Sequence, residues 1–86
     1  MEIVFSRSFR KALAKLSKRQ QDLVEAAVTC FGENRADPAL RDHALKGRLQ
    51  GLRAFSAAWN LRVIYREEGG FITIILVDVG THSQVY

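Results

Sequence analysis

The stretch WNLRVIYREEGGFITIILVDV, residues 59–79, decides the fold. Its first part alternates apolar and polar side chains, and its last nine residues form the most apolar run in the chain. Alternation with a period of two is typical of a strand with one wetter face, whereas a short, continuously apolar run indicates an interior strand. The segment EEGG at residues 67–70 predicts a hairpin turn between the two. The centre of the fold is therefore predicted to be two antiparallel strands over residues 59–66 and 71–79.

Further strands and two helices are expected on the N-terminal side of this hairpin. MEIVF at residues 1–5 and LRAFSA at residues 52–57 have strand composition. Apolar residues at spacings of three and four predict a helix over residues 8–16, begun by Ser6 or Ser8. The sequence SKRQ at residues 17–20 has the form of a capping box, so a second helix should begin there and end near Gly32. The two helices then form a hairpin with almost no loop.

This order of elements predicts an α+β fold, in which a small antiparallel-dominated sheet carries an N-terminal helical hairpin on one face. The opposite face should stay partly open and serve as a binding surface. A length of 86 residues predicts a single domain over residues 1–86. No apolar run approaches the roughly 18 residues of a membrane span, and the first positive charges follow the first apolar residues, unlike a signal peptide. We therefore expect a cytoplasmic protein, with its single cysteine, Cys30, as a structural thiol.

The positive charge is concentrated in the first part of the chain. Residues 1–53 hold 11 Lys or Arg and 6 Asp or Glu, whereas residues 54–86 hold 2 and 3. Between Glu2 and Asp22 there are six basic side chains and no acid. Such a surface favours a polyanion or an acidic partner protein, although a solvated helix face has the same composition.

Two histidines are the residues best suited to chemistry near neutral pH. His43 lies in a segment rich in cations, with Arg41, Lys46 and Arg48 beside it, and His82 follows the predicted interior strand. Histidines that transfer protons, together with arginines that stabilise the phosphorane charge, suit phosphoryl transfer in RNA, where the 2′-OH is the nucleophile. Exposed loop histidines with local hydrogen bonds are the alternative. No Cys/His cluster or zinc-binding helix motif is present, so no metal site is expected.

Four short motifs carry a family resemblance. They are DHALKG at residues 42–47, GLR at 51–53, LRVIY at 61–65 and GTHS at 80–83. Their order and spacing resemble the RelE/ParE toxin superfamily, most closely its YafQ-like branch. The resemblance covers about half of the chain, and the helical hairpin agrees only in pattern.

The resemblance implies a cytoplasmic toxin of a type II toxin–antitoxin system that cleaves mRNA on the ribosome, without metal or cofactor. By position, His82 and His43 would transfer protons, Arg53 would stabilise the phosphate, and Tyr86 would stack on a base. RNA phosphates would be held by Lys46, Arg48, Arg62 and Arg41. The implied partners are a cognate antitoxin, mRNA and ribosomal RNA.

Three positions depart from the YafQ-like pattern. Ser56 stands where a further histidine is usual, Asn60 where an aspartate is usual, and Asp78 where an arginine often precedes the GTH motif. An anion at position 78 would repel the scissile phosphate, and Arg62 would then have to supply the positive charge. A ParE-like, non-enzymatic gyrase inhibitor and a catalytically degenerate antitoxin-binding protein therefore remain alternatives.

Overall fold

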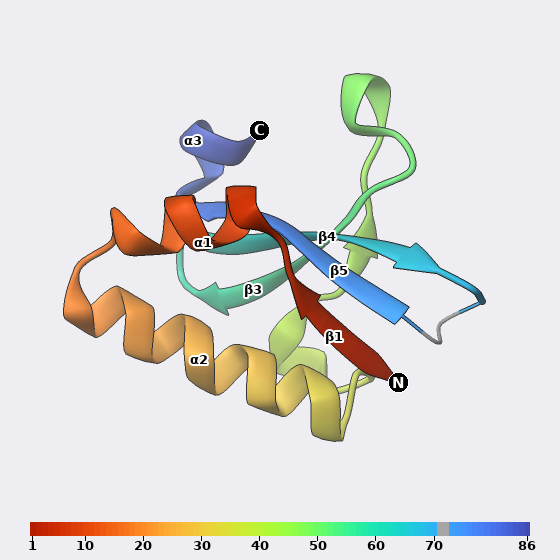
Figure 1. Ribbon diagram of the computed structural model, residues 1–86, viewed down its shortest axis with the longest axis horizontal. Helices are drawn as coiled ribbons and strands as arrows, with labels where there is room; N and C mark the ends of the chain where they lie inside the picture. The colour runs from red at the N-terminus through yellow and green to blue at the C-terminus, as the bar shows by residue number, and fades with distance from the viewer. Residues whose placement is uncertain (71–72) are drawn as a thin grey trace.

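The structure, a computed structural model, describes residues 1–70 and 73–86. Within these residues a mixed five-stranded sheet has the strand order β1-β5-β4-β3-β2, with helices α1 and α2 packed on one face (Figure 1). The fold is the expected α+β arrangement. The strands are β1 (Glu2–Phe5), β2 (His43–Ala44), β3 (Arg53–Ala58), β4 (Leu61–Glu68) and β5 (Thr73–Gly80).

The predicted hairpin forms the middle of the sheet. Strands β4 and β5 pair in antiparallel fashion, as do β3 and β4, and β5 is an interior strand as expected. Residues 71 and 72 of the predicted third strand lie outside the described residues. The pairing of β1 with β5 is parallel, with Glu2 opposite Thr73 and Phe5 opposite Leu76. Parallel pairing requires a long crossover between the strands, and the helical hairpin forms part of that connection.

Capping side chains fix the two helices where the sequence predicted. Helix α1 spans Arg7–Ala14, and the Ser6 hydroxyl accepts a hydrogen bond from the Phe9 main-chain N–H at 3.1 Å. Helix α2 spans Lys18–Glu33, and the Ser17 and Gln20 side chains accept each other's main-chain N–H at 3.1 and 3.0 Å. The capping box is thus confirmed, while Gly32 lies within α2 one residue before its end. Asp37 caps the short 3₁₀ turn η1 (Pro38–Leu40) through its side chain.

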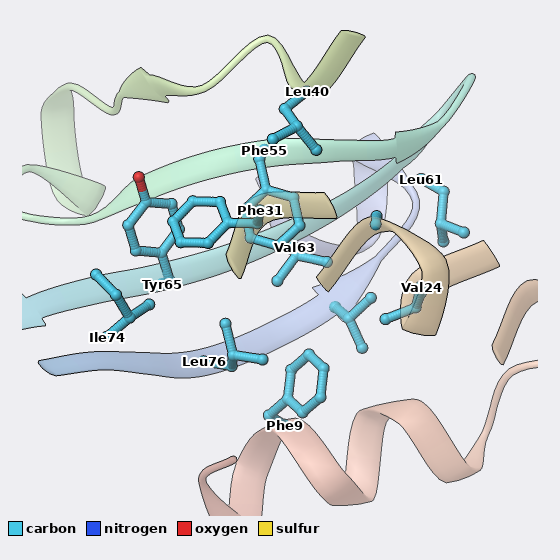
Figure 2. Close-up of a cluster of buried hydrophobic side chains, with 12 residues drawn as sticks. Phe9, Val24, Phe31, Leu40, Phe55, Leu61, Val63, Tyr65, Ile74 and Leu76 are labelled. Atoms are coloured by element: carbon cyan, nitrogen blue, oxygen red, sulfur yellow. The ribbon is translucent and has the colours of Figure 1, made fainter. Parts of the chain in front are cut away.

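The core lies between the sheet and the helical hairpin (Figure 2). The rings of Phe31 and Phe55 stack with their centroids 4.6 Å apart, and Tyr65 meets Phe31 edge-on at 5.0 Å. Phe9 of α1 is fully buried beside Leu76 of β5. Burial of side chains of this size contributes about 1.5–3 kcal/mol each before the entropy cost of folding. This face of the sheet therefore holds most of the fold's stability.

The opposite face is less open than predicted. Ala54 and Ile64 pair across β3 and β4 and, by strand alternation, point away from Phe55 and Val63, yet they are 0% and 2% exposed. The short helix α3 (His82–Val85) and the segment 43–52 project on this side, away from α2 (Figure 1). That segment contains β2 and the 3₁₀ turn η2 (Gly47–Leu49).

The strand prediction is wrong for Trp59. The apolar alternation predicts Trp59 within a strand, on the half-buried face that holds Val63, but it lies in the tight turn between β3 and β4 and is 93% exposed. Asn60, the next residue in this turn, has a φ of 58°. Asparagine tolerates this left-handed conformation better than other non-glycine residues, which makes it a turn residue.

Candidate functional site

Helix α3 places His82 directly beyond the end of β5. The Thr81 main-chain N–H donates to the Gln84 side-chain oxygen at 2.8 Å, and the His82 main-chain N–H donates to Asn60 Oδ1 at 3.1 Å. Asn60, one of the three positions that depart from the family pattern, thus ties α3 to the β3–β4 turn. The His82 side chain itself is exposed. The main chain of His82 is therefore fixed by hydrogen bonds, while its ring remains accessible to a ligand.

Tyr86 lies against the His82 ring. The two ring centroids are 4.4 Å apart with an interplanar angle of 79°, an edge-to-face contact, and the Tyr86 N–H donates to the His82 carbonyl at 3.0 Å. The four-residue spacing of the two side chains brings them onto one side of a helical turn. The structure therefore places the two side chains in direct contact.

The Tyr86 hydroxyl is buried and finds no hydrogen-bond partner among the described residues. Loss of water raises the pKa of this hydroxyl above its ordinary value, and the positive charge of Arg62 opposes the shift. Arg62 is held in place by hydrogen bonds to Ser56 Oγ at 3.3 Å and to the Ala58 carbonyl at 3.1 Å. Ser56, a second departure from the family pattern, therefore positions a cation near Tyr86.

A second cation reaches Tyr86 from the segment 43–52. Arg48 Nη2 donates to the main-chain oxygen of Tyr86 at 2.6 Å, across 38 residues of sequence. This bond joins η2 to α3, both of which lie on the side of the sheet away from α2 (Figure 1). Lys46 is exposed at the start of the same turn. The structure thus brings together four sequence-predicted residues: His82, Tyr86, Arg62 and Arg48.

His43 does not meet His82. It lies on edge strand β2 opposite Ala54, and its Nδ1 lies 2.8 Å from the Arg41 carbonyl. Strands β3 and β4 separate β2 from β5, which corresponds to roughly 14 Å at the spacing of neighbouring strands. The side chains of His43 and Arg41 are exposed, at the edge of the sheet.

Arg53 also lies apart from the His82 cluster. It alternates with Ala54 along β3 and so points to the same face as Phe55, where its Nε donates to the Tyr65 hydroxyl at 3.0 Å and to Asp42 at 3.3 Å. Arg35 bonds the same Asp42 at 3.2 Å and Glu67 at 2.9 Å. The Arg53 charge is therefore shared with carboxylates within a structural network.

Asp78, the third departure, turns its carboxylate to its own backbone. Its Oδ1 accepts the Val79 main-chain N–H at 2.8 Å. The residue lines a small recess of about 210 Å³ together with Lys15, which directly follows α1, and Gln84 of α3. An anion at this position thus has a local partner and a cation nearby, a role that the sequence did not indicate.

No group of three or more His, Cys, Asp or Glu side chains in the described part of the chain is placed to hold a metal ion. No described helix is long and apolar enough to cross a membrane.

Several solved structures share this fold. YafQ from E. coli strain BL21(DE3) is 19% identical, with 99% of this chain and 97% of that chain covered and a TM-score of 0.81. A metal-bound toxin from Helicobacter pylori is 29% identical, with 100% and 99% covered and a TM-score of 0.79. YafQ in the E. coli DinJ–YafQ complex is 20% identical, with 99% and 97% covered and a TM-score of 0.78.

No curated protein sequence matches the chain. A family model does, over residues 1–86, and it describes the bacterial toxin YafQ of type II toxin–antitoxin systems. Together with the fold, this match establishes that the chain belongs to the YafQ family of type II toxins.

Proposed function

We propose that this toxin is an mRNA endonuclease that acts on the ribosome, in the cytoplasm, and that a cognate antitoxin restrains it. The observation that supports cleavage most directly is the cluster of His82 with Tyr86, Arg62 and Arg48. It combines a group that can transfer protons, an aromatic ring and two cations on an accessible edge of the protein. A cognate antitoxin is supported by a relative of the same fold, YafQ of E. coli, which forms a complex with DinJ.

The reaction needs no external nucleophile. The RNA 2′-oxygen forms a bond to the adjacent phosphorus, the bond from phosphorus to the 5′-oxygen breaks, and a cyclic 2′,3′-phosphate and a 5′-hydroxyl result. A base takes the 2′-OH proton, and an acid returns a proton to the 5′-oxygen. One of these transfers is assigned to His82, whose side chain is exposed. The proposal includes no metal ion in the cleavage step.

The positive charge for the phosphorane is assigned to Arg62 and Arg48. Both approach Tyr86, whereas the Arg53 guanidinium bonds Asp42 and Tyr65. Cations that are already positioned stabilise developing negative charge without reorganisation. Arg53 then has a structural role, because it holds the segment 43–52 through Asp42. His43, Arg41 and Lys46 contact other nucleotides of the same RNA.

A translating extract with a defined mRNA tests this proposal. Purified protein should produce cleavage at ribosome-bound positions, with 5′-hydroxyl ends, and should leave the same mRNA intact when ribosomes are absent. His82→Ala should reduce the cleavage rate at least about a hundredfold, the usual contribution of general acid–base catalysis. Ser83→Ala, on the same helix, is the matched control. Intact mRNA at high dose, or equal cleavage by the His82 variant, contradicts the proposal.

A non-enzymatic toxin that inhibits DNA gyrase is the second candidate. The separation of His43 from His82 and the carboxylate partners of Arg53 favour it, because both leave the histidine–arginine constellation incomplete. Under this alternative the fold serves only as a protein-binding surface. Inhibition of supercoiling by the purified protein, without mRNA cleavage, would establish it.

A further inference from the structure

A groove separate from the His82–Tyr86 contact runs along α2, beside the free end of β3. It has a volume of about 490 Å³. Helix α2 contributes Leu23, Ala26 and Cys30, the turn after η1 contributes Arg41, and the β3–β4 hairpin contributes Trp59 and Arg62. Figure 1 shows α2 running beneath β3 on this side of the molecule.

The floor of the groove is apolar and exposed. Its α2 residues follow one another at helical spacings of three and four, so they form one face of the helix. Leu23 is 37% exposed, and Trp59, at the end of the groove, is 93% exposed. Large apolar side chains that gather on an exposed surface mark an interaction site rather than a core.

The charged residues that line the groove are both arginines, whereas the carboxylates of α2 line an adjoining hollow. No Asp or Glu side chain is among its lining residues, whereas Arg41 and Arg62 stand at its rim. An occupant with an apolar stripe and flanking carboxylates would match both properties. Nucleic acid fits less well, because one aromatic ring and two arginines face a floor of alanine and leucine side chains that offer nothing to a phosphate.

The backbone of the groove favours a helix over an added strand. Strand β2 covers β3 only at Arg53 and Ala54, which leaves the outer edge of β3 free from Ser56 onward. The Ala58 carbonyl on this stretch already accepts hydrogen bonds from the Arg62 and Ser56 side chains. Strand addition relies on free main-chain groups, whereas a helix relies on apolar anchors in a groove.

We propose that this groove binds an acidic amphipathic helix of the antitoxin, with apolar residues against α2 and Trp59 and carboxylates on Arg41 and Arg62. Both arginines are also assigned to RNA, so the helix would compete with RNA for them. The competition and the choice of the antitoxin as occupant rest on the proposed function, whereas the capacity of the groove to bind an acidic amphipathic helix does not.

The single tryptophan of the chain makes the docking measurable. The probes are peptides selected against the chain from a displayed library of helix-forming 16-residue sequences. We expect the selected peptides to carry an apolar stripe flanked by Glu or Asp, and to shift Trp59 fluorescence to shorter wavelength as the indole leaves water. Ala26→Arg, at an exposed position of α2 in the groove, should weaken binding about tenfold or more. Thr29→Arg lies outside the lining and should leave binding unchanged.

The possible results distinguish the docking proposal from the proposed nuclease activity. Failure to select any peptide, selection of peptides without acidic residues, or equal binding to the Ala26 variant overturns the docking proposal. A single-stranded RNA oligonucleotide that shifts Trp59 fluorescence, and loses the effect with Ala26→Arg, overturns it in favour of RNA. Peptide binding without mRNA cleavage supports the docking proposal and contradicts the proposed nuclease activity. Cleavage without peptide binding supports the nuclease activity and contradicts the docking proposal.

Discussion

Asp42 is the residue that anchors the segment between α2 and β3. Its side chain is 13% exposed, and its carboxylate accepts hydrogen bonds from Arg35, Arg53 and the Tyr65 hydroxyl. Burial alone would raise the pKa of Asp42, but these three donors outweigh it and lower the pKa below its ordinary value. The same carboxylate therefore orders two arginines and holds the chain just before His43.

Asp42→Asn should destabilise the fold by about 2–4 kcal/mol at neutral pH, because the variant leaves two partly buried guanidinium groups without this carboxylate. Since the folded pKa is lowered, the contribution of Asp42 is present above the unfolded pKa of about 3.9 and is lost as the pH falls through the folded value. Urea unfolding at pH 7 and at about pH 3 measures both effects, and the gap between wild type and variant should narrow in acid.

Glu68→Gln is the control for this prediction. Its carboxylate pairs with Arg66, but both side chains are about half exposed. Exposed pairs contribute roughly 0–1 kcal/mol, so this variant should unfold almost as wild type does. A stability loss at Glu68 as large as that at Asp42 would contradict the importance assigned to the network.

Contacts between residues close in sequence could be predicted, whereas contacts that depend on the pairing of strands could be predicted less well. The spacing of His82 and Tyr86 is four, and local helical geometry brings them together. The family pattern places Arg53 at the phosphate because it follows a glycine, yet alternation with the buried Phe55 already puts it on the core face of β3. The roles of Ser56 and Asn60 depend on partners that only the folded sheet supplies.

At the scale of elements, the fold requires glycine where β5 passes into α3. A Cβ built on Gly80 would lie 2.8 Å from the Gln84 side-chain oxygen and 3.2 Å from Val85 Cγ1. That oxygen accepts the Thr81 N–H that begins the helix. Helix α3 can therefore pack closely on β5 only because residue 80 has no side chain.

Gly80→Ala should destabilise the protein by about 1–3 kcal/mol, because the extra methyl group overpacks this junction and displaces α3. Gly32→Ala is the matched control with the opposite sign. Its Cβ would meet Ile3 at an ordinary 3.5 Å within helix α2, so the substitution should stabilise by about 0.5–1 kcal/mol. Urea unfolding of both variants checks the prediction, and a stable Gly80 variant with native α3 signals by NMR would refute it.

The bond from Arg48 to Tyr86 links two elements that the backbone does not connect directly. Arg48→Ala should leave global stability within about 0.5 kcal/mol, because the side chain is exposed. The main-chain N–H groups of α3 should exchange faster with solvent, since the helix is only four residues long and loses a tether. Hydrogen exchange measures this effect, with Gln50→Ala as the control in the same segment. Unchanged exchange in α3 would show that the bond does not restrain it.

The long elements were predictable from the sequence because each carries its own signal. The capping box at Ser17 and the apolar alternation of β4 both act within a few residues. Strand β2 has two residues and α3 has four, too few to show a period, so neither could be predicted. The parallel pairing of β1 depends on the whole crossover and has no local signature.

At the scale of the molecule, a second group of positive charges lies on α1, apart from the two arginines that line the apolar groove. Six cations lie within residues 7–19, on α1, the turn that follows it and the beginning of α2, and Lys18 pairs with Asp22 at 2.8 Å. Arg10 and Lys11 are exposed and make no ion pair with any carboxylate in residues 1–70 and 73–86. The surface of α1 is therefore available to a polyanion, and ribosomal RNA is the polyanion that the proposed function requires.

Neutralising two cations of α1 should weaken the association with ribosomes in a salt-dependent manner. Each lost phosphate contact lowers the slope of log affinity against log salt by about 0.7–0.9, so Arg10→Gln with Lys11→Gln should reduce it by about 1–2. Affinity for purified ribosomes, measured between about 50 and about 200 mM salt, gives this slope. Lys18→Gln with Arg66→Gln has the same net charge but removes cations that already pair with carboxylates, so its slope should stay near wild type. Equal slopes for the two double variants would mean that only net charge matters and that α1 does not contact RNA.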